Sequence, residues 1–420
     1  MNSHGTKQTI GIVGLGYVGL PLAVAFAEAG DNVIALDTDM RKISALQAGE
    51  SYIEDISTER LKAALPSINV TTRHARLAQA SAIIICVPTP LTRNREPDLS
   101  ALLSAARSLR DVLQSGQLVV LESTTFPGTT REYLTPILEE SGLKVGEDIF
   151  VGFSPERVDP GRTDYNLRTT PKVVSGLTNA CAVCAYGLYS RICDHVVRVS
   201  TPEAAEMTKL LENIFRSVNI ALVNELAILA DRMGIDIWEV IDAASTKPYG
   251  YMRFDPGPGM GGHCLPVDPF YLTWRAREFG MATEFIELAG KVNQQMPLYC
   301  VERVERALND LQLPIRGTKI AVIGVAYKAG SSDIRESPAL KIIEALHERG
   351  GEVIYHDPFV PALESQNLSS AVFEDILDAQ IAVIVTAHPN VDYEALLQRV
   401  PRVIDLRGHT RQGSTTAVQL

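Results

Sequence analysis

The sequence predicts an α/β protein with two Rossmann-like, doubly wound parallel sheets joined by a central helical domain that holds one long helix. Short apolar strands alternate with helical patterns in the first third of the chain and again in the last third, which is typical of parallel sheets. Between them an apolar periodicity runs without a breaker from Thr201-Pro202 to about Met233. We expect domains at 1–200, 201–312 and 313–420.

Bulk composition narrows the class of protein. The chain has 420 residues, enough for two or three domains, with 46% hydrophobic and 21% charged residues, as in ordinary globular proteins. A net charge of −11 argues against nucleic acid or an anionic membrane as the main partner. No apolar run reaches membrane-spanning length and the start lacks a signal-peptide layout, so we expect a cytoplasmic protein.

The first strand–turn–helix has the layout of a dinucleotide site. Thr9–Val13 leads into GLGYVG, a helical run follows from Leu20 to Ala29, and Val33–Asp37 is a second strand. Such glycines let a pyrophosphate approach the helix start, and the acidic residue about 20 positions on binds the ribose. A carboxylate there repels a 2′-phosphate, so we expect NAD rather than NADP; a glycine-rich turn without a ligand is the alternative. The expected contacts are Gly14, Gly16, Tyr17, Val18, Gly19 and Asp37.

Three further apolar strands are expected at 82–87, 117–121 and 149–153. Thr89, Thr124 and Glu156 follow them, at the carboxyl ends where open parallel sheets bind ligands. Each threonine is alternatively a turn or cap residue, and Glu156 a solvated surface carboxylate.

The cysteine spacing predicts neither a disulfide framework nor a metal site. Six cysteines in this length do not suggest a disulfide framework. Cys181 and Cys184, with Cys193 and His195 beyond, have no matching second pair and extend the apolar positions of a helix-like run, Asn179–Arg191. We therefore expect no metal.

The long central helix carries Lys209 and Asn213 at i and i+4, on one face. These side chains lie either on the wet side of the helix or at a polar site facing a cleft. A helix of this length can connect two domains and supply a dimer surface, so we expect a homodimer or higher homo-oligomer. A second long helical pattern covers Glu284–Leu311.

A glycine- and proline-rich stretch at 257–269, the thiol loop, is the focus of the chemistry. It cannot form a regular helix or strand, and it presents Cys264 and, four residues on, Asp268. Asp268 is placed to N-cap a helix from Phe270 to Gly280. Cys264 is either a nucleophile near a helix start or a buried packing cysteine, and Asp268 a cap, a catalytic partner or both.

The last third repeats the strand–helix order of the first without its glycine fingerprint. Residues 317–324 and 350–357 match the first two strands, and 338–349 matches the first helix. A longer loop, 325–337, replaces the glycine turn, and it places Lys328 and Arg335 where a phosphate would sit. We read a nucleotide-type fold for a second phosphorylated ligand; a degenerate copy that serves only assembly is the alternative.

Five motifs together resemble the UDP-glucose/GDP-mannose dehydrogenase family over nearly the whole chain. They are Gly14–Gly19 (GLGYVG), Ser154–Arg157 (SPER), Thr208–Asn213 (TKLLEN), Gly259–Asp268 (GMGGHCLPVD) and Tyr327–Pro338 (YKAGSSDIRESP). The resemblance implies that the C6 alcohol of a nucleotide sugar is oxidised to a carboxylate with two NAD, in the synthesis of surface polysaccharide precursors. It implies a UDP-sugar as the bound partner.

The resemblance also implies catalytic roles. Cys264 resembles the family's thiol nucleophile, which carries first a thiohemiacetal and then a thioester. Lys209 resembles its active-site lysine, and Asn213 a substrate and oxyanion ligand. Asp268 resembles the aspartate that positions or activates water.

Further roles are implied on the first sheet and on the loops. Glu156 resembles the glutamate of thioester hydrolysis, and Thr124 the threonine beside the attacking water. The implied substrate contacts are Glu156, Arg157, Lys209, Asn213, Gly261, His263 and Lys328. The implied further cofactor contacts are Thr89, Thr124 and Arg335.

The residues around the thiol loop indicate which sugar is used. His263 resembles the branch that acts on UDP-N-acetylhexosamines, because the UDP-glucose branch commonly has tyrosine there. Lys247–Met252 is most similar to members that act on UDP-N-acetylglucosamine, although Arg253 stands where a proline is more usual. The alternatives are UDP-N-acetylmannosamine or UDP-glucose as substrate, a two-electron hydroxyacid dehydrogenase, or a non-catalytic NAD-sensing protein.

Overall fold

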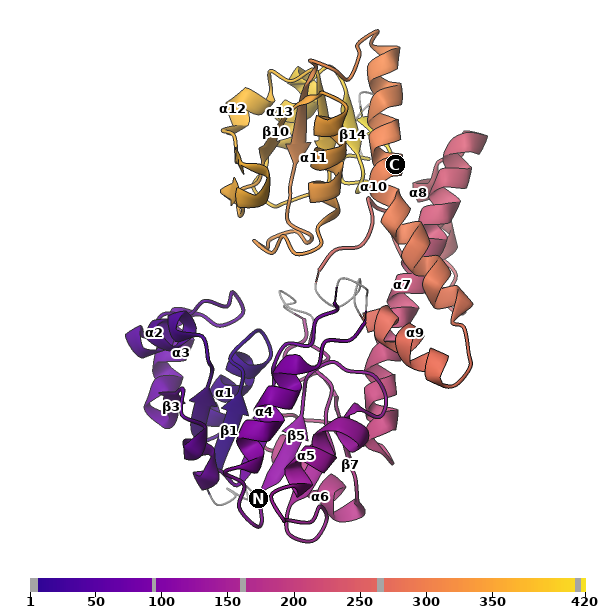
Figure 1. Ribbon diagram of the computed structural model, residues 1–420. Helices are drawn as coiled ribbons and strands as arrows, with labels where there is room; N and C mark the ends of the chain where they lie inside the picture. Colours follow the sequence, from indigo (N-terminus) through magenta and orange to yellow (C-terminus); the bar gives the residue numbers. More distant parts are fainter. Residues whose placement is uncertain (1–6, 93–95, 159–163, 263–267, 412–416) are drawn as a thin grey trace. The chain divides into compact units, whose positions relative to one another are not determined.

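The strand predicted at Thr9–Val13 lies inside an eight-stranded sheet with the order β3-β2-β1-β4-β5-β6-β7-β8 (Figure 1). The computed structural model describes residues 7–92, 96–158, 164–262, 268–411 and 417–420. They divide into two units: Met1–Glu212 with Trp274–Met281 (unit 1), and Asn213–Thr273 with Ala282–Leu420 (unit 2). Each unit is described by itself.

Unit 1 contains the eight-stranded sheet, in which the β6–β7 pair is antiparallel and every other neighbouring pair is parallel. Its strands are β1 Thr9–Val13, β2 Asn32–Leu36, β3 Ile68–Thr71, β4 Ala82–Ile85, β5 Leu118–Leu121, β6 Phe150–Phe153, β7 Lys172–Gly176 and β8 Val196–Arg198. Its helices are α1 Gly19–Glu28, α2 Met40–Ala48, α3 Thr58–Ala64, α4 Ser100–Arg110, α5 Thr135–Glu139 and α6 Asn179–Tyr189, with short turns η1 Leu65–Ser67, η2 His74–Gln79 and η3 Thr129–Leu134.

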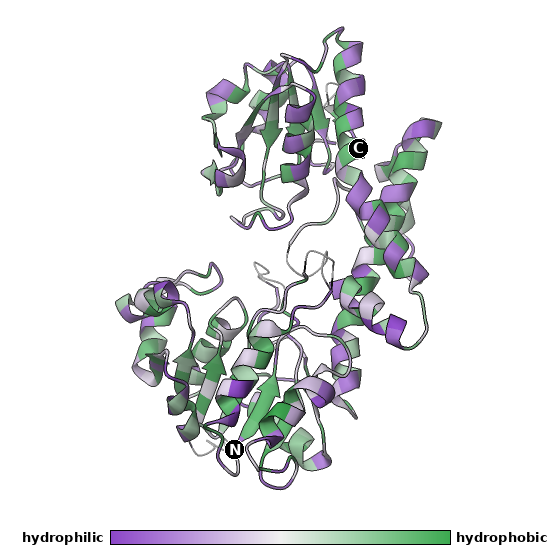
Figure 2. Ribbon diagram, viewed as in Figure 1, coloured by the Kyte–Doolittle hydropathy of each residue, from purple (hydrophilic) through white to green (hydrophobic). Residues whose placement is uncertain are grey.

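The central strands of this sheet are apolar on both faces because helices cover both. Every residue of β4 and β5 is buried, as expected for a parallel sheet between helical layers. Figure 2 shows these strands as hydrophobic and the flanking helices as mixed. The sequence pattern did not predict β3, β7 and β8, each of which contains polar or charged residues among its apolar ones.

A long helix, α7 (Pro202–Met233), runs from unit 1 into unit 2, as the breaker-free periodicity predicted. It is the one helix among the described residues that is long and apolar enough to cross a membrane by length and composition; 39% of its most apolar window is buried. In unit 2 it packs with α10 (Glu284–Asp310), where Asp231 of α7 binds Arg303, Arg306 and the Tyr299 hydroxyl.

The rest of unit 2 is a five-stranded parallel sheet with the order β10-β9-β13-β14-β15. Its strands are β9 Lys319–Ile323, β10 Glu352–His356, β13 Ile381–Ile384, β14 Val403–Asp405 and β15 Ala417–Gln419, with a small pair β11 Ala362–Leu363 and β12 Leu368–Ser369. Its helices are α8 Ile237–Ser245, α11 Pro338–Glu348, α12 Phe373–Ile376 and α13 Tyr393–Arg399, with the turn η4 Glu364–Gln366; α9 Asp268–Glu278 runs between the units.

The predicted fold class is therefore confirmed. In chain order, a helical segment separates two largely parallel α/β sheets, and the matched strands and helices fall within a few residues of their expected bounds. The fifth strand of the second sheet, β15, was not predicted. The division into three domains remains a prediction.

Candidate active site

The glycine turn of unit 1 has the geometry that a dinucleotide requires. Gly14 has φ +94°, and a Cβ there would lie 2.6 Å from the Cys86 carbonyl oxygen. A Cβ on Gly19 would lie 1.8 Å from the Gly14 carbonyl oxygen, so helix and strand need this glycine to meet. Nothing lies within 4 Å of a Cβ built on Gly16, where the backbone stays open to a pyrophosphate. These residues fit NAD, and Tyr17 and Val18 lie between them at the start of α1.

Asp37 ties the end of the second strand to this turn. Its carboxylate accepts from the Leu15 N–H at 2.8 Å, the Asp39 N–H at 2.9 Å and the Lys42 ammonium at 2.9 Å. Burial alone would raise the pKa of Asp37, but these donors outweigh it and hold the pKa below its usual value. An ionised carboxylate at this position suits a ribose hydroxyl. The sequence reasoning did not include Lys42, which only the folded turn brings to Asp37.

The polar residues after β4, β5 and β6 gather at one edge of the sheet, as predicted. The Thr89 hydroxyl donates to the Thr124 carbonyl at 2.6 Å, and the Ser123 hydroxyl to the Val87 carbonyl at 2.6 Å. Because β5 and β6 are adjacent, Thr124 and Glu156 follow neighbouring strands. Side-chain hydrogen bonds thus hold the loops after β4 and β5 to one another at this edge of the sheet.

Glu156 and Arg157 are both anchored. One oxygen of Glu156 accepts from the Arg157 and Val158 N–H groups at 3.0 and 2.6 Å, and the other from Lys172 at 2.9 Å. The Arg157 guanidinium binds Glu212 at 2.7 Å and the Pro171 carbonyl at 2.6 Å. Glu156 is therefore an ordered carboxylate, not the freely solvated one that was its alternative reading.

Unit 2 joins two of the predicted catalytic residues. The buried Asn213 amide donates to the carboxylate of Asp268, which is also buried. The helix α9 begins at Asp268 itself, two residues before the predicted Phe270. Lys209, half-buried in unit 1, lies one turn before Asn213 on α7.

The described part of the thiol loop, residues 257–262, is anchored by a chain of buried amides. The Gly257 N–H donates to Asn224 Oδ1 at 2.9 Å, Asn224 donates to Asn293 Oδ1 at 3.0 Å, and Asn293 donates to the Ser217 carbonyl at 3.1 Å. These contacts link the loop to α7 and α10. His263 and Cys264 lie outside the described residues, so their predicted roles stay predictions.

Residues 257–262 of the thiol loop also lie against loop 325–337. The Gly262 N–H donates to the Arg335 carbonyl at 2.9 Å, and a Cβ on Gly261 would lie 2.6 Å from Tyr327 Cβ. Arg335 also forms a two-point ion pair with Asp333. Lys328 sits half-buried on this loop. The structure thus joins Gly261, Lys328 and Arg335 in one assembly of loops.

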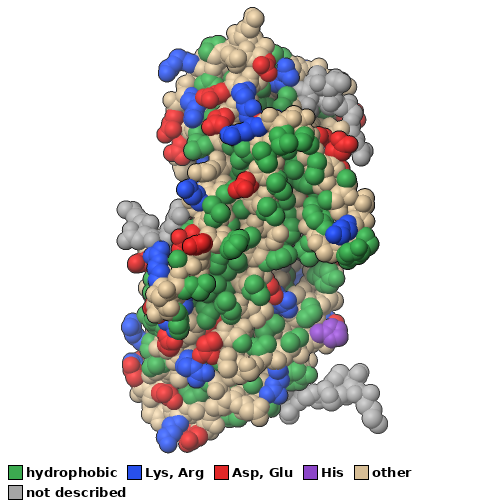
Figure 3. Space-filling view, turned by 90° about the vertical axis from the view of Figure 1, so that its right-hand side faces the viewer, with side chains coloured by type: hydrophobic (Ala, Val, Ile, Leu, Met, Phe, Trp, Pro, Cys, Tyr) green, Lys and Arg blue, Asp and Glu red, His purple; other side chains and the backbone are tan. Residues whose placement is uncertain are grey.

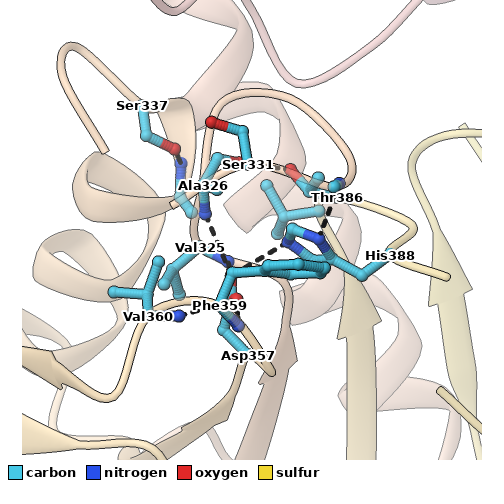
Figure 4. Close-up of polar contacts among 12 residues, drawn as sticks. Val325, Ala326, Ser331, Ser337, Asp357, Phe359, Val360, Thr386 and His388 are labelled. Carbon is cyan, nitrogen blue, oxygen red and sulfur yellow. Dashed lines mark hydrogen bonds and ion pairs between the residues drawn. The ribbon is translucent and has the colours of Figure 1, made fainter. Parts of the chain in front are cut away.

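A buried carboxylate holds the base of loop 325–337 (Figure 4). Asp357 accepts from the N–H groups of Val325 and Ala326 at 2.7 and 3.1 Å, and it pairs with His388 Nε2 at 3.0 Å. His388 Nδ1 accepts from the Gly330 N–H at 3.1 Å. Although burial opposes it, His388 and these N–H groups lower the pKa of Asp357.

Several residues of the site were missed by the sequence reasoning. Glu122, Lys172 and Tyr189 surround Glu156 from behind, and Asn224, Asn293 and His388 fix loops. Glu122 directly follows the apolar run 117–121, and this position at the end of a buried strand was the available signal. Within the described ranges no three His, Cys, Asp or Glu side chains gather as a metal site.

Comparison with known proteins agrees with this arrangement. Residues 8–193 match the NAD binding domain of the UDP-glucose/GDP-mannose dehydrogenase family, 203–295 its central domain and 321–412 its UDP binding domain. The chain is 37% identical over 394 residues to the UDP-N-acetyl-D-mannosamine dehydrogenase of Pyrococcus horikoshii, covering 92% of each chain. It is 37% identical over 360 residues to the UDP-N-acetyl-D-glucosamine 6-dehydrogenase of Pseudomonas aeruginosa, covering 85% of this chain and 84% of that protein.

The fold matches solved structures over the same length. A structure of the UDP-D-ManNAc dehydrogenase of Pyrococcus horikoshii superposes with a TM-score of 0.90 at 35% identity and covers 98% of each chain. The family domains, the identity over nearly the full length and the NAD-type turn agree. The chain belongs to the UDP-glucose/GDP-mannose dehydrogenase family and is an NAD-dependent UDP-sugar dehydrogenase.

Proposed function

We propose that the chain oxidises the C6 alcohol of a UDP-N-acetylhexosamine, UDP-N-acetylglucosamine above all, to the carboxylate in a four-electron reaction through Cys264. Relatives that share 37% identity are named for both the glucosamine and the mannosamine sugar. The stretch Lys247–Met252 favours the former. The reaction would take place in the cytoplasm and would supply acidic sugar precursors for surface polysaccharides.

The anchored thiol loop is the observation that carries this proposal. Asn224 and Asn293 hold residues 257–262 from one side, and loop 325–337 meets Gly261 and Gly262 from the other. A nucleophile gains from such fixed placement because the entropy of positioning is removed before reaction. The described loop therefore supports a thiol presented at a defined point rather than a packing cysteine.

Individual residues take the following roles in the proposal. Lys209 and Asp268 hold the water that removes the C6 hydroxyl proton, and NAD, when bound, accepts the hydride. Cys264 captures the aldehyde and holds the acyl carbon after the second oxidation. Lys209 and Asn213 donate to the oxyanion, each worth about 3 kcal/mol when well placed. Glu156, with Thr124 beside it, activates the water that releases the acid.

The Asn213–Asp268 contact supports the proposed role of Asn213 as an oxyanion ligand. One amide proton of Asn213 points at Asp268, which fixes the side-chain rotamer and leaves the second amide proton for an oxyanion. Because both groups are buried, their electrostatic interactions are strong. Gly261, His263, Lys328, Arg335 and Arg157 are proposed to bind substrate or cofactor groups around this core.

The NADH yield per sugar tests the reaction. We expect two NADH per UDP-N-acetylglucosamine, fewer turnovers with UDP-N-acetylmannosamine and least with UDP-glucose. A Cys264→Ala variant should bind NAD and UDP-sugar but form no acid. One NADH per sugar indicates a two-electron dehydrogenase, and full acid formation by Cys264→Ala removes the thiol mechanism.

A homodimer built on α7 is also part of the proposal. Phe215, Leu222, Leu226, Leu229 and Met233 are exposed along one stripe of α7 in unit 2. Figure 3 shows hydrophobic side chains gathered over one face of the molecule. A second copy of the same helix is the occupant that such a self-complementary stripe fits.

Light scattering on the purified protein tests this interface. Leu226→Asp should convert the dimer into a monomer, because it buries a charge at the centre of the stripe. Val183→Asp, at an exposed apolar residue of α6, is the control that should leave the mass unchanged. A wild-type monomer, or a Leu226→Asp dimer, contradicts the proposal. The three-domain division at 1–200, 201–312 and 313–420 is proposed alongside it.

A further inference from the structure

Glu156 is one member of a buried group of four side chains, the Lys172 cluster (Glu122, Glu156, Lys172 and Tyr189). The Lys172 ammonium, at the start of β7, donates to Glu122 and, at 2.9 Å, to Glu156. The second oxygen of Glu122 accepts from the Tyr189 hydroxyl of α6. The Lys172 ammonium also lies 5.3 Å from the centre of the Tyr189 ring. The four groups form one chain of contacts across β5, β6, β7 and α6.

The members of the cluster differ in exposure. The side chain of Lys172 is 3% exposed and that of Glu122 is fully buried, whereas Glu156 keeps 17% of its surface. Tyr189 is fully buried. Glu156 is thus the one member of the cluster with a substantially exposed side.

The hydrogen bonds of Glu156 leave room for one reacting group. Three donors, the Arg157 N–H, the Val158 N–H and Lys172, occupy three of the roughly four lone-pair positions of an ionised carboxylate. The remaining position belongs to the oxygen that Lys172 holds. Lys172 therefore decides where the free lone pair of Glu156 points.

The charges explain why Glu156 stays ionised. Burial would raise the pKa of Glu156, but the Lys172 ammonium and the Val158 N–H lower it below its usual value. Glu122, more deeply buried, has its pKa raised by burial against the pull of Lys172. Burial also opposes the charge on Lys172, yet the two carboxylates raise the pKa of this lysine. One ammonium is shared by two acids that compete for it.

We propose that Lys172 is a positioning residue for Glu156: it fixes the open oxygen of Glu156 and keeps this carboxylate ionised, while Glu122 and Tyr189 hold Lys172 in place. The inference rests on the proposed function, in which Glu156 serves the release of the acid. Lys172 touches neither substrate nor cofactor in this scheme.

The step that it serves is the hydrolysis of the thioester. A water O–H bond breaks and its proton passes to Glu156, while the water oxygen forms a bond to the acyl carbon. The C–S bond then breaks, and the electron pair leaves with the Cys264 sulfur. No oxidant is consumed. A protonated Glu156 cannot accept the water proton, so the step slows below the pKa of Glu156.

The test measures this step directly. Rapid quench of a single turnover follows the release of the acid after NADH formation, from pH 3 to 8, because the lowered pKa of Glu156 puts the wild-type decline at the acidic end of this range. In Lys172→Met two buried carboxylates lose their shared cation. The acidic limb, which is the fall in the rate of acid release at low pH, should therefore move to a higher pH by about one pH unit or more. A burst of two NADH per active site should precede slow release. Lys144→Met, which alters an exposed lysine of the same unit, is the matched control.

Glu122→Gln gives a prediction of opposite sign. The glutamine oxygen accepts from Lys172 and its amide donates to the Tyr189 oxygen, so the contacts persist without the competing charge. Lys172 then serves Glu156 alone, and the acidic limb should move down. Lys172→Arg, which keeps the cation, should restore most of the release rate lost in Lys172→Met. A purely structural role predicts no opposite shifts.

The outcomes separate this inference from the proposed function. An unmoved acidic limb in Lys172→Met, or shifts of the same direction in both variants, overturns the role of Lys172 while the two-NADH burst still stands. If Lys172→Met does not bind NAD, Glu122→Gln decides alone, and an unmoved or raised limb overturns the role. One NADH per sugar in every variant overturns the proposed function instead.

Discussion

Both sheets begin with a strand, a glycine of positive φ and a second strand that is followed by an aspartate. The Gly14 N–H donates to the Leu36 carbonyl at 2.8 Å, and the Gly324 N–H to the His356 carbonyl at 2.9 Å. The next N–H then donates to the aspartate, from Leu15 to Asp37 at 2.8 Å and from Val325 to Asp357 at 2.7 Å. The same backbone arrangement is thus built twice.

The two aspartates differ in how many further hydrogen bonds their carboxylates can accept. Asp37 accepts from two backbone N–H groups and Lys42. Asp357 accepts from Val325, Ala326, Phe359 and Val360 and pairs with His388. An ionised carboxylate has about four lone-pair positions, so Asp357 is saturated and Asp37 is not. The aspartate serves the turn in both sheets, and only in the first does it keep capacity for a ribose.

The largest effect is expected from the glycine of the second turn. Gly324 has φ +77°, and a Cβ there would lie 2.0 Å from the Thr386 carbonyl oxygen. Gly324→Ala combines backbone strain with a clash against main chain, and we expect it to lower the free energy of unfolding by about 4 kcal/mol. Denaturant unfolding measures this loss.

Matched glycines isolate the clash from the strain. Gly317 has φ +76° with nothing within 4 Å, so Gly317→Ala should cost about 1 kcal/mol. In unit 1, Gly14 of the first turn and Gly30 after α1 both have φ +94°, but only a Cβ on Gly14 meets main chain. Equal costs for Gly324→Ala and Gly317→Ala would show that the close approach to Thr386 does not matter.

Asp357→Asn should cost stability, and Asp37→Asn should cost cofactor affinity. An amide at 357 turns an NH₂ group toward backbone N–H donors and removes the charge beside His388, for a loss of about 3 kcal/mol in the free energy of unfolding. Asp37→Asn should cost about 1 kcal/mol but weaken NAD binding about tenfold. Unfolding curves and NAD titrations of both variants measure the four values. Reversed results would contradict the assignment of cofactor binding to the first turn.

The sequence predicted the local parts of these sites and missed those made by distant contacts. Gly14–Gly19 and Asp37 lie on one strand–turn–helix–strand unit, so spacing alone indicated their role. The contact between Lys172 and Glu122 spans 50 positions, and that between Tyr189 and Glu122 spans 67. Both depend on the order of strands in the sheet, and the antiparallel β7 that supplies Lys172 was itself not predicted.

The second turn shows the same limit. The loop 325–337 was recognised as a replacement for the glycine fingerprint, but its anchor was not, because Asp357 and His388 carry no local pattern. The buried pair Asn224 and Asn293, 69 positions apart, lay inside helical runs and looked like ordinary surface amides. Cys264 was predicted from composition and motif, and it lies outside the described residues.

Cofactor choice sharpens the comparison at the first turn. Asp37→Ser removes the charge that repels a 2′-phosphate and leaves Lys42 beside the vacated position. The ratio of kcat/KM for NAD to that for NADP should fall at least about tenfold, as the loss of one charged contact implies. Initial rates with both cofactors measure it.

The role of Lys42 in this switch needs a second variant. In Asp37→Ser/Lys42→Ala the gain with NADP should be largely lost, because no cation remains to meet the phosphate. Ser substitution at Asp357 should leave the cofactor ratio unchanged. An NADP gain that persists without Lys42 would assign the phosphate contact to another group.

The last prediction concerns pH. The two turn aspartates, Asp37 and Asp357, and the buried Glu206 of unit 1 respond to pH in opposite directions. The lowered pKa values of Asp37 and Asp357 add stability above pH 4 that is lost only as the pH falls below it. Glu206 accepts from the Gly128 and Thr130 N–H groups, yet burial raises its pKa to about 7. Its contribution is full below pH 4.5 and is lost as the pH rises through 7.

Glu206→Gln should therefore matter more at pH 5 than at pH 7. The stability difference between wild type and Glu206→Gln should shrink by about 2 kcal/mol over this range, since a neutral amide does not titrate. Glu203→Gln on the same helix is the control: the pKa of Glu203 is lowered, by the Arg131 hydrogen bond acting against burial, so its contribution stays constant between pH 5 and 7. Denaturant unfolding at both pH values measures both variants. A difference for Glu206→Gln that stays constant from pH 5 to pH 7 would contradict this prediction. It would mean that Glu206 is ionised in the folded protein over this range, because the N–H groups of Gly128 and Thr130 outweigh its burial, as the N–H donors of the two turns do for Asp37 and Asp357.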